Sequence, residues 1–119
     1  MARRPSDDLG PLPGDAVSIG SGLNGRGEAV GHSFRADGPV KALLRGSPGG
    51  LSTVRHFLDR NTTRAFLYSG GRMQDLNGLI PRSAGWTLLD ARGINDRGQI
   101  VGSGLHHGQK RAFLLTPVR

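Results

Sequence analysis

Apolar residues in this chain gather in short runs that are separated by glycine and by small polar residues. The clearest runs lie in AVSI (16–19), AFLY (65–68) and QIVGS (99–103). Runs of this length, bounded by turn residues, are typical of β-strands rather than of helices. AFLY is apolar throughout, which predicts a strand covered on both faces. The pattern therefore predicts an all-β chain of short antiparallel strands.

Two pairs of these runs are joined by residues that favour tight turns. RAFLY (64–68) and RMQDL (72–76) flank Ser69-Gly70-Gly71, and a Gly-Gly pair supplies the positive φ values of a tight hairpin turn. GIN (93–95) and QIVG flank Asp96-Arg97-Gly98, where Asn or Asp early in the turn and Gly after it favour a compact β-turn. Each pair therefore predicts an antiparallel hairpin.

The longest recurring element is a segment of ten residues. GLNGRGEAVG (22–31) matches GINDRGQIVG (93–102) at a constant offset of 71 residues. Recurrence at a fixed offset is the signature of a repeat protein. We interpret the shared glycines and asparagines as repeat-defining structural residues: Gly22, Asn24, Gly27, Gly31, Gly93, Asn95, Gly98 and Gly102.

Two shorter elements also recur. RAFL occurs at 64–67 and 111–114, and KALL at 41–44 is similar. Asp-Leu followed by a small or turn residue occurs in DLGPLPG (8–14) and DLNGLIP (75–81). These elements add further repeat-defining positions: Ala65, Phe66, Leu67, Asp75, Leu76, Ala112 and Phe113.

The two RAFL copies define a repeat unit of 47 residues, from Ala65 to Ala112. The unit holds about four predicted strands, around GIN, QIVGS, AFL and MQDL, which is the size of one propeller blade. Counting back from Ala65 to Ala42 gives only 23 residues, so half a unit is missing before the first RAFL. We therefore expect blade-like repeats of an incomplete β-propeller, or another stacked β-repeat array.

These units predict the organisation of the chain. We expect a disordered N-terminus at 1–7, a partial repeat unit at 8–45, a degenerate connector at 46–63, a full repeat unit at 64–116 and a tail at 117–119. About three or more stacked repeats are normally needed for stability, so we expect the chain to be the C-terminal fragment of a longer array. Unpaired edges of its terminal strands predict self-association, or pairing with further repeat units of a parent chain.

The three elements resemble the HAF-repeat family of probable extracellular repeat proteins from bacteria. The family consensus runs roughly G-I-N-x-x-G-x-V-V-G, then His-Ala-Phe-Leu, then G-x-M-x-D-L-G. The match is carried by residues 93–102, 64–77 and 8–14. The family histidine is replaced by Lys41, Arg64 and Arg111, so no role of that imidazole carries over. The resemblance implies a β-propeller-like scaffold, an extracellular or cell-surface location, and no established catalytic activity.

The charge of the chain allows a second function. The formal net charge is +7, and 14 of the 16 basic residues are arginine. A basic chain can bind nucleic acid or another polyanion. However, the arginines are scattered from Arg3 to Arg119, without a long run or a helical stripe. Solvated charge is therefore favoured, and a basic module that binds polyanions is the alternative.

Composition also limits the chemistry and the location of this chain. Cysteine is absent, which excludes disulfides and thiolate metal sites. No apolar run approaches the roughly 18 residues of a membrane span. The start, MARRPSDDLG, has basic residues but no apolar stretch behind them, so it does not predict a signal peptide.

One segment carries the spacing of a nucleotide-binding loop. Gly20, Gly22 and Gly25 spell G-x-G-x-x-G, a motif that requires a strand before it and a helix after it. The following residues, RGEAVGHSF, alternate small and apolar side chains and favour a strand. The second copy has Ala91 and Asp96 in place of two of the glycines. We therefore interpret the spacing as coincidence and expect no cofactor.

The other candidate groups do not assemble into a catalytic or metal motif in the sequence. His32 and His56 stand alone, and HHGQK (106–110) predicts an exposed hairpin loop whose adjacent histidines point in different directions. No serine lies in G-x-S-x-G, so we expect no enzyme activity, catalytic residue or metal. Trp86, in a predicted linker between strands, is the candidate ligand contact, although packing is the more common role of such a residue.

Overall fold

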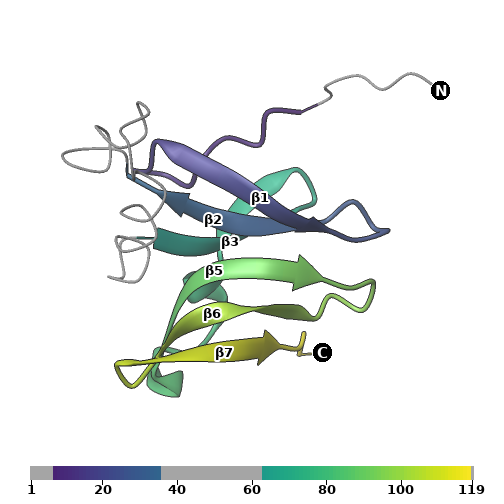
Figure 1. Cartoon of the computed structure of the whole chain (residues 1–119). Coiled ribbons are helices and arrows are strands. Elements are labelled where there is room, and N and C mark those ends of the chain that lie inside the picture. Colours follow the sequence, from purple (N-terminus) through teal and green to yellow (C-terminus); the bar gives the residue numbers. More distant parts are fainter. Residues whose placement is uncertain (1–6, 36–62, 119) are drawn as a thin grey trace, which may run out of the picture.

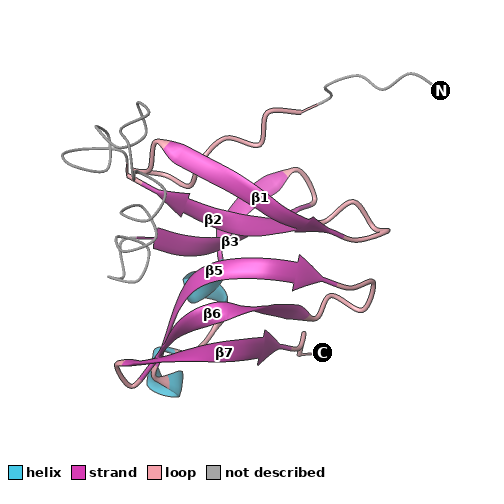
Figure 2. Cartoon of the chain, in the orientation of Figure 1, coloured by secondary structure: helices cyan, strands magenta, loops and turns pink. Residues whose placement is uncertain are grey.

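A computed structural model describes residues 7–35 and 63–118 of the chain (Figure 1). Strands dominate these residues, and the helices among them are two short 3-10 turns (Figure 2). The elements in chain order are β1 (Val17–Leu23), β2 (Ala29–Phe34), β3 (Thr63–Ser69), β4 (Arg72–Asp75), η1 (Leu76–Leu79), η2 (Arg82–Ala84), β5 (Trp86–Ile94), β6 (Ile100–His106) and β7 (Gln109–Leu115). The all-β prediction is confirmed.

The strands form two antiparallel sheets. The first sheet has the order β1-β2-β3-β4, and the second sheet has the order β5-β6-β7. In each sheet, strands that follow one another in the chain lie side by side (Figure 1). Neither sheet closes into a barrel. Strand β5 packs against β1, β2 and β3, so it forms most of the contact of the second sheet with the first.

The predicted hairpins are present. Gly70 and Gly71 have φ values of 61° and 80° and join β3 to β4. Gly98, with a φ of 80°, lies in the turn between β5 and β6. The consecutive residues Ala65 and Phe66 of β3 are both buried, which confirms that this strand is covered on both faces.

Equivalent strands pair in the same register in the two sheets. Pairs between β1 and β2 recur between β5 and β6, 71 residues later: Ile19–His32 matches Asp90–Ser103, and Gly22–Val30 matches Gly93–Val101. Pairs between β2 and β3 recur between β6 and β7: Val30–Leu67 matches Val101–Leu114, and His32–Ala65 matches Ser103–Ala112. The irregularity between Gly20 and Gly22 also recurs, between Ala91 and Gly93. The sequence repeat is therefore a structural repeat.

The hydrophobic core lies between the two sheets. The first sheet and the turn after it contribute buried apolar side chains, and the second sheet contributes the rest of the cluster. The buried members are Val30, Ala65, Leu76, Leu88, Ala91, Ile100 and Phe113. The two copies of the repeat are thus packed on each other by apolar contact.

The boundaries of the two sheets differ from the boundaries of the repeat units expected from the sequence. Strands β3 and β4, which fall in the expected unit 64–116, complete the first sheet with β1 and β2. Strands β5 to β7 form the second sheet alone. The reason is that RAFL at 64–67, rather than KALL at 41–44, supplies the strand beside β2. KALL lies outside the described residues, as do 1–6 and nearly all of the connector.

The recurring Asp-Leu element is a turn in both copies. Asp8 Oδ1 accepts a hydrogen bond from the N–H of Gly10 at 3.0 Å, and Asp75 Oδ1 accepts one from the N–H of Asn77 at 2.9 Å. Residues 8–14 contain no strand, although Leu12 is buried. In each copy, an Asx turn therefore comes before the first strand of a sheet.

Candidate functional site

The repeat-defining asparagines hold the tips of two equivalent hairpins. Asn24 Oδ1 accepts hydrogen bonds from the N–H groups of Arg26 and Glu28, both at 3.0 Å. Asn95 makes the same two bonds in the second sheet, at 3.0 and 2.9 Å. One side chain thereby satisfies two backbone donors of a turn, a role that asparagine performs well.

Glu28 ties the first hairpin to the end of β3. Its Oε1 accepts a hydrogen bond from Asn24 Nδ2 at 2.8 Å, and its Oε2 accepts one from Ser69 Oγ at 2.9 Å. These two bonds hold the pKa of Glu28 below its ordinary value. Gln99 replaces Glu28 in the second hairpin and accepts the corresponding bond from Asn95 at 2.9 Å.

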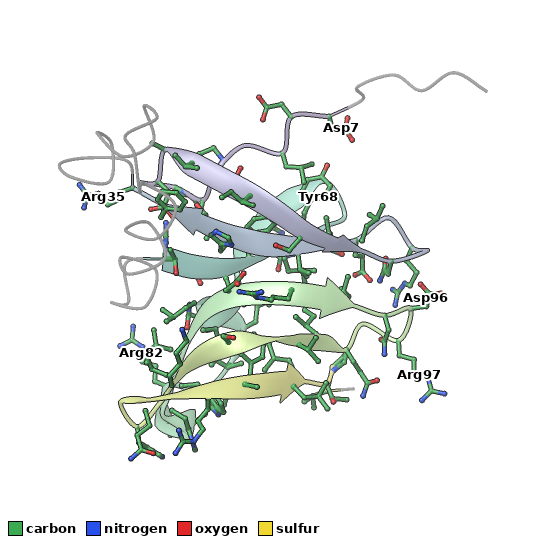
Figure 3. All side chains as sticks on the ribbon, in the orientation of Figure 1. Asp7, Arg35, Tyr68, Arg82, Asp96 and Arg97 are labelled. Carbon is green, nitrogen blue, oxygen red and sulfur yellow. The ribbon has the colours of Figure 1, made fainter. Side chains whose placement is uncertain are left out.

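The two hairpin tips also contact each other. Asn24 Nδ2 donates to the carbonyl oxygen of Asn95 at 2.8 Å, and the Gly25 N–H donates to Asp96 Oδ1 at 2.6 Å. Asp96 lies at the tip of its hairpin in Figure 3, on the side of the molecule where the turn between β1 and β2 lies. A Cβ at Gly25 would approach Asp96 Oδ1 to 3.1 Å. The two hairpin tips are therefore complementary, because one copy has Gly25 where the other has Asp96.

A glycine lies beneath a phenylalanine ring in each sheet. Gly31 pairs with Phe66, and Gly102 pairs with Phe113. A Cβ at either glycine would overlap a backbone carbonyl oxygen of the preceding strand and would meet the ring at 2.8 or 2.7 Å. Only glycine allows the strands to approach this closely. This explains why both copies of the repeat keep glycine here.

Arg64 takes a structural place where the resembled family has histidine. Its guanidinium binds Asp15 Oδ2 through Nη2 at 3.0 Å and Asp75 Oδ2 through Nη1 at 3.2 Å. It also donates to the carbonyl oxygen of Pro13 at 2.7 Å. Arg111, its counterpart in the second sheet, donates to Lys110 and Gln109 of its own strand. Arg64 therefore fixes the segment that leads into β1.

An ion pair that the sequence did not predict joins the two sheets. His32 Nδ1 on β2 lies 3.0 Å from Asp90 Oδ1 on β5, and Arg92 Nε lies 2.8 Å from Asp90 Oδ2. Burial raises the pKa of Asp90, but the hydrogen bonds and charges of His32 and Arg92 together lower it by more than burial raises it. The pKa of Asp90 therefore lies below its ordinary value. His32 Nε2 is buried and has no hydrogen-bond partner. The pair links the two repeat copies across their interface.

Asn77 makes a second polar link between the sheets. Its Oδ1 accepts from the Leu88 N–H at 2.6 Å, and its Nδ2 donates to the Leu88 carbonyl oxygen at 2.9 Å. The amide thereby satisfies both backbone groups of one residue in β5. The repeat did not indicate Asn77, because the first copy has Gly10 at the equivalent position.

The aromatic residues at one end of the second sheet form a stacked cluster. Trp86 stacks on His106 with ring centroids 4.4 Å apart, and it meets the edge of Phe113 at 6.1 Å. The His107 ring lies 4.3 Å from that of His106. The His107 N–H donates to the Gly85 carbonyl oxygen at 2.9 Å, and a Cβ at Gly85 would overlap the His107 ring. We call Trp86, His106 and His107 the aromatic cluster.

The aromatic cluster corrects two predictions. Trp86 is the first residue of β5 rather than part of a linker, because it pairs with His106. The adjacent histidines do not point in different directions. His107 has a φ of 51°, a left-handed conformation that turns its ring back toward His106. The predicted hairpin is present, with His107 and Gly108 as its two turn residues.

Within 7–35 and 63–118, no group of three or more His, Asp or Glu side chains is placed to hold a metal ion. In the same ranges, no helix is long and apolar enough to cross a membrane. The residues of the G-x-G-x-x-G spacing lie in β1 and in the turn after it, and the strand β2 follows, as the alternation predicted.

A comparison of the chain with protein-family models, curated proteins and solved structures finds no match.

Proposed function

We propose that this chain is a non-catalytic β-repeat module, made of propeller-blade-like units, that acts as a structural or binding scaffold. The observation that carries the proposal is the repeated register of the two sheets, with the same asparagine-held turn and the same glycine under a phenylalanine ring. Repeats that stack by apolar faces form extended surfaces, and such surfaces are used for binding. The resemblance to the HAF-repeat family adds the proposal that the module works outside the cell.

The polar side chains support a scaffold role. His32, Asp90 and Asn77 link the two sheets, and Arg64 holds the segment before β1. Each of these groups is used in a contact that holds the fold together. These contacts support a structural account of the repeat more than a reaction.

Within this module, the aromatic cluster is the proposed ligand surface. Trp86 packs against the core but is only partly buried, and the rings of His106 and His107 lie beside it, with His107 exposed. Stacking of a sugar ring on an aromatic face, with hydrogen bonds to nearby polar groups, is the binding chemistry that such a surface offers. We propose a saccharide as the ligand class.

The test uses the intrinsic fluorescence of Trp86, which is the single tryptophan of the chain. We expect a saturable change in emission on titration with one of a panel of soluble oligosaccharides. His106→Ala should weaken binding about tenfold or more, since it removes the ring that supports Trp86. Tyr68→Phe, on the first sheet, is the control and should bind as the wild type does (Figure 3). The absence of a saturable change across the panel would rule out saccharide binding at this cluster.

Polyanion binding is the alternative function. Arg64, Arg92 and Arg26 lie within 4 Å of carboxylates of the same chain, which favours structural use of these charges. A titration with duplex DNA over a series of salt concentrations separates the two proposals. A polyanion binder would lose affinity steeply as salt rises, whereas we expect weak binding without a steep salt dependence.

A further inference from the structure

The two sheets differ in which of their equivalent residues are covered. Val30 of the first sheet is 0% exposed, and its counterpart Val101 in the second sheet is 49% exposed. Ala65 is buried and Ala112 is exposed. Leu67 packs against the core, whereas its counterpart Leu114 is 61% exposed. The face of β2 and β3 that receives the second sheet is therefore present again on β6 and β7, where no residue of the described ranges packs over Val101 and Leu114 as the second sheet packs over Val30.

The complementary side of the interface is open at the other end. Strand β5 packs against the first sheet, and its residue Ile94 packs against the core. The equivalent strand β1 exposes Leu23 at 71% and Ile19 at 43%. These two residues and the open side of the second sheet account for four of the six exposed large apolar residues in the described ranges: Ile19, Leu23, Val101 and Leu114.

We propose that a second copy of this chain docks head to tail, with its β1 side against the β6–β7 face of the first copy. This inference rests on the proposed blade-like stacking of the repeats. The occupant is fixed by the molecule itself, since the contact between its two sheets is the template for the contact between copies. The β1 face in question is the counterpart of the surface that already covers Val30 and Leu67.

The substitutions between the copies suit this contact. The ion pair between His32 and Asp90 would have Ser103 and Ile19 as its counterparts at the junction between copies. No charged side chain is thus buried there at these two positions, and burial of an unpaired charge is the usual obstacle to association. A heterologous contact of this kind forms a ring if its rotation closes, and a filament if it does not.

The test uses two surface variants of the whole chain, each with one side blocked. Variant one carries Val101→Glu and Leu114→Glu, and variant two carries Ile19→Glu and Leu23→Glu. Because all four residues are exposed in one copy, both variants should fold, which circular dichroism and a thermal melt verify. Leu79→Glu is the matched control, because Leu79 is 53% exposed but lies in η1, outside both proposed docking sides.

Sedimentation velocity over a concentration series gives the result. We expect wild type and Leu79→Glu to associate, and each blocked variant to be monomeric, with affinity at least about tenfold weaker. An equimolar mixture of the two variants should form a 1:1 dimer, because one intact side of each remains. A wild type that stays monomeric, or a variant two that dimerises alone, would overturn the proposal. The fluorescence titration of variant one reports saccharide binding separately, so failure of one proposal is distinguishable from failure of the other.

Discussion

Val30 and Val101 occupy the same position in two copies of one structural unit, yet one is fully buried and the other is about half exposed. The same contrast holds between Ala65 and Ala112. The strands, turns and register around each pair are alike, so neighbours rather than local sequence set the burial. The molecule therefore contains its own control. A substitution at equivalent positions should have equal effects where it acts within a sheet and unequal effects where it acts between sheets.

The largest effect should come from the glycines beneath the phenylalanine rings. Gly31→Ala and Gly102→Ala each place a methyl group against a backbone carbonyl oxygen, and we expect each to reduce the free energy of unfolding by about 3 kcal/mol or more. Gly20→Ala is the control, because no atom lies within 4 Å of a Cβ there. Urea denaturation measures all three. A tolerated alanine at Gly102 would show that the second sheet does not repeat the first.

The asparagines at the hairpin tips should give the next largest effect. Asn95→Ala should cost about 1 to 2 kcal/mol, because two turn N–H groups lose their acceptor. Asn24→Ala should cost about 1 kcal/mol more, since Asn24 also donates to the Asn95 carbonyl oxygen across the sheets. Equal losses for the two variants in urea denaturation would contradict the contact between the tips.

The ion pair between the sheets should give a smaller effect that depends on pH. The folded-state pKa of Asp90 lies below its ordinary value. Its contribution is therefore fully present above the unfolded pKa of about 4, and it is lost as pH falls through the lower folded pKa. Asp90→Asn should cost about 1 kcal/mol near pH 6 and should flatten the loss of stability below pH 4.

Thermal melts from pH 6 down to pH 2.5 would check this prediction. Asp7→Asn, at an exposed position near the N-terminus, is the control and should melt as the wild type does (Figure 3). If the melting temperature of Asp90→Asn fell between pH 4 and pH 2.5 as steeply as that of the wild type, the pair would contribute nothing to the interface.

Much of the fold could be predicted from local sequence. The turns at Gly70-Gly71 and after Asn95 follow from residues that adopt positive φ or hold a turn with their own side chains. The repeat between 22–31 and 93–102 indicated equivalent hairpins because the chemistry of each turn lies within ten residues. Local patterns of this kind need no knowledge of the remainder of the chain.

The partners of the strands could not be predicted in the same way. KALL lies closer to β2 in the sequence than RAFL does, but strand β3 comes from RAFL. His32 and Asp90 are 58 residues apart, and their counterparts Ser103 and Ile19 form no such pair. The cluster around Trp86 depends on the left-handed backbone of His107, which glycine or asparagine adopts more readily. Such contacts are set by packing.

The most direct test of the account compares Val30→Ala with Val101→Ala. Both variants remove two methyl groups from equivalent positions, one beneath the second sheet and one on the open face. The free energy of unfolding should be measured in urea at a protein concentration where the chain is monomeric. We predict a loss of about 2 kcal/mol for Val30→Ala and of less than about 0.5 kcal/mol for Val101→Ala. Equal losses would contradict the claim that the two sheets are copies of one structural unit, of which the first is covered by the second and the second is uncovered.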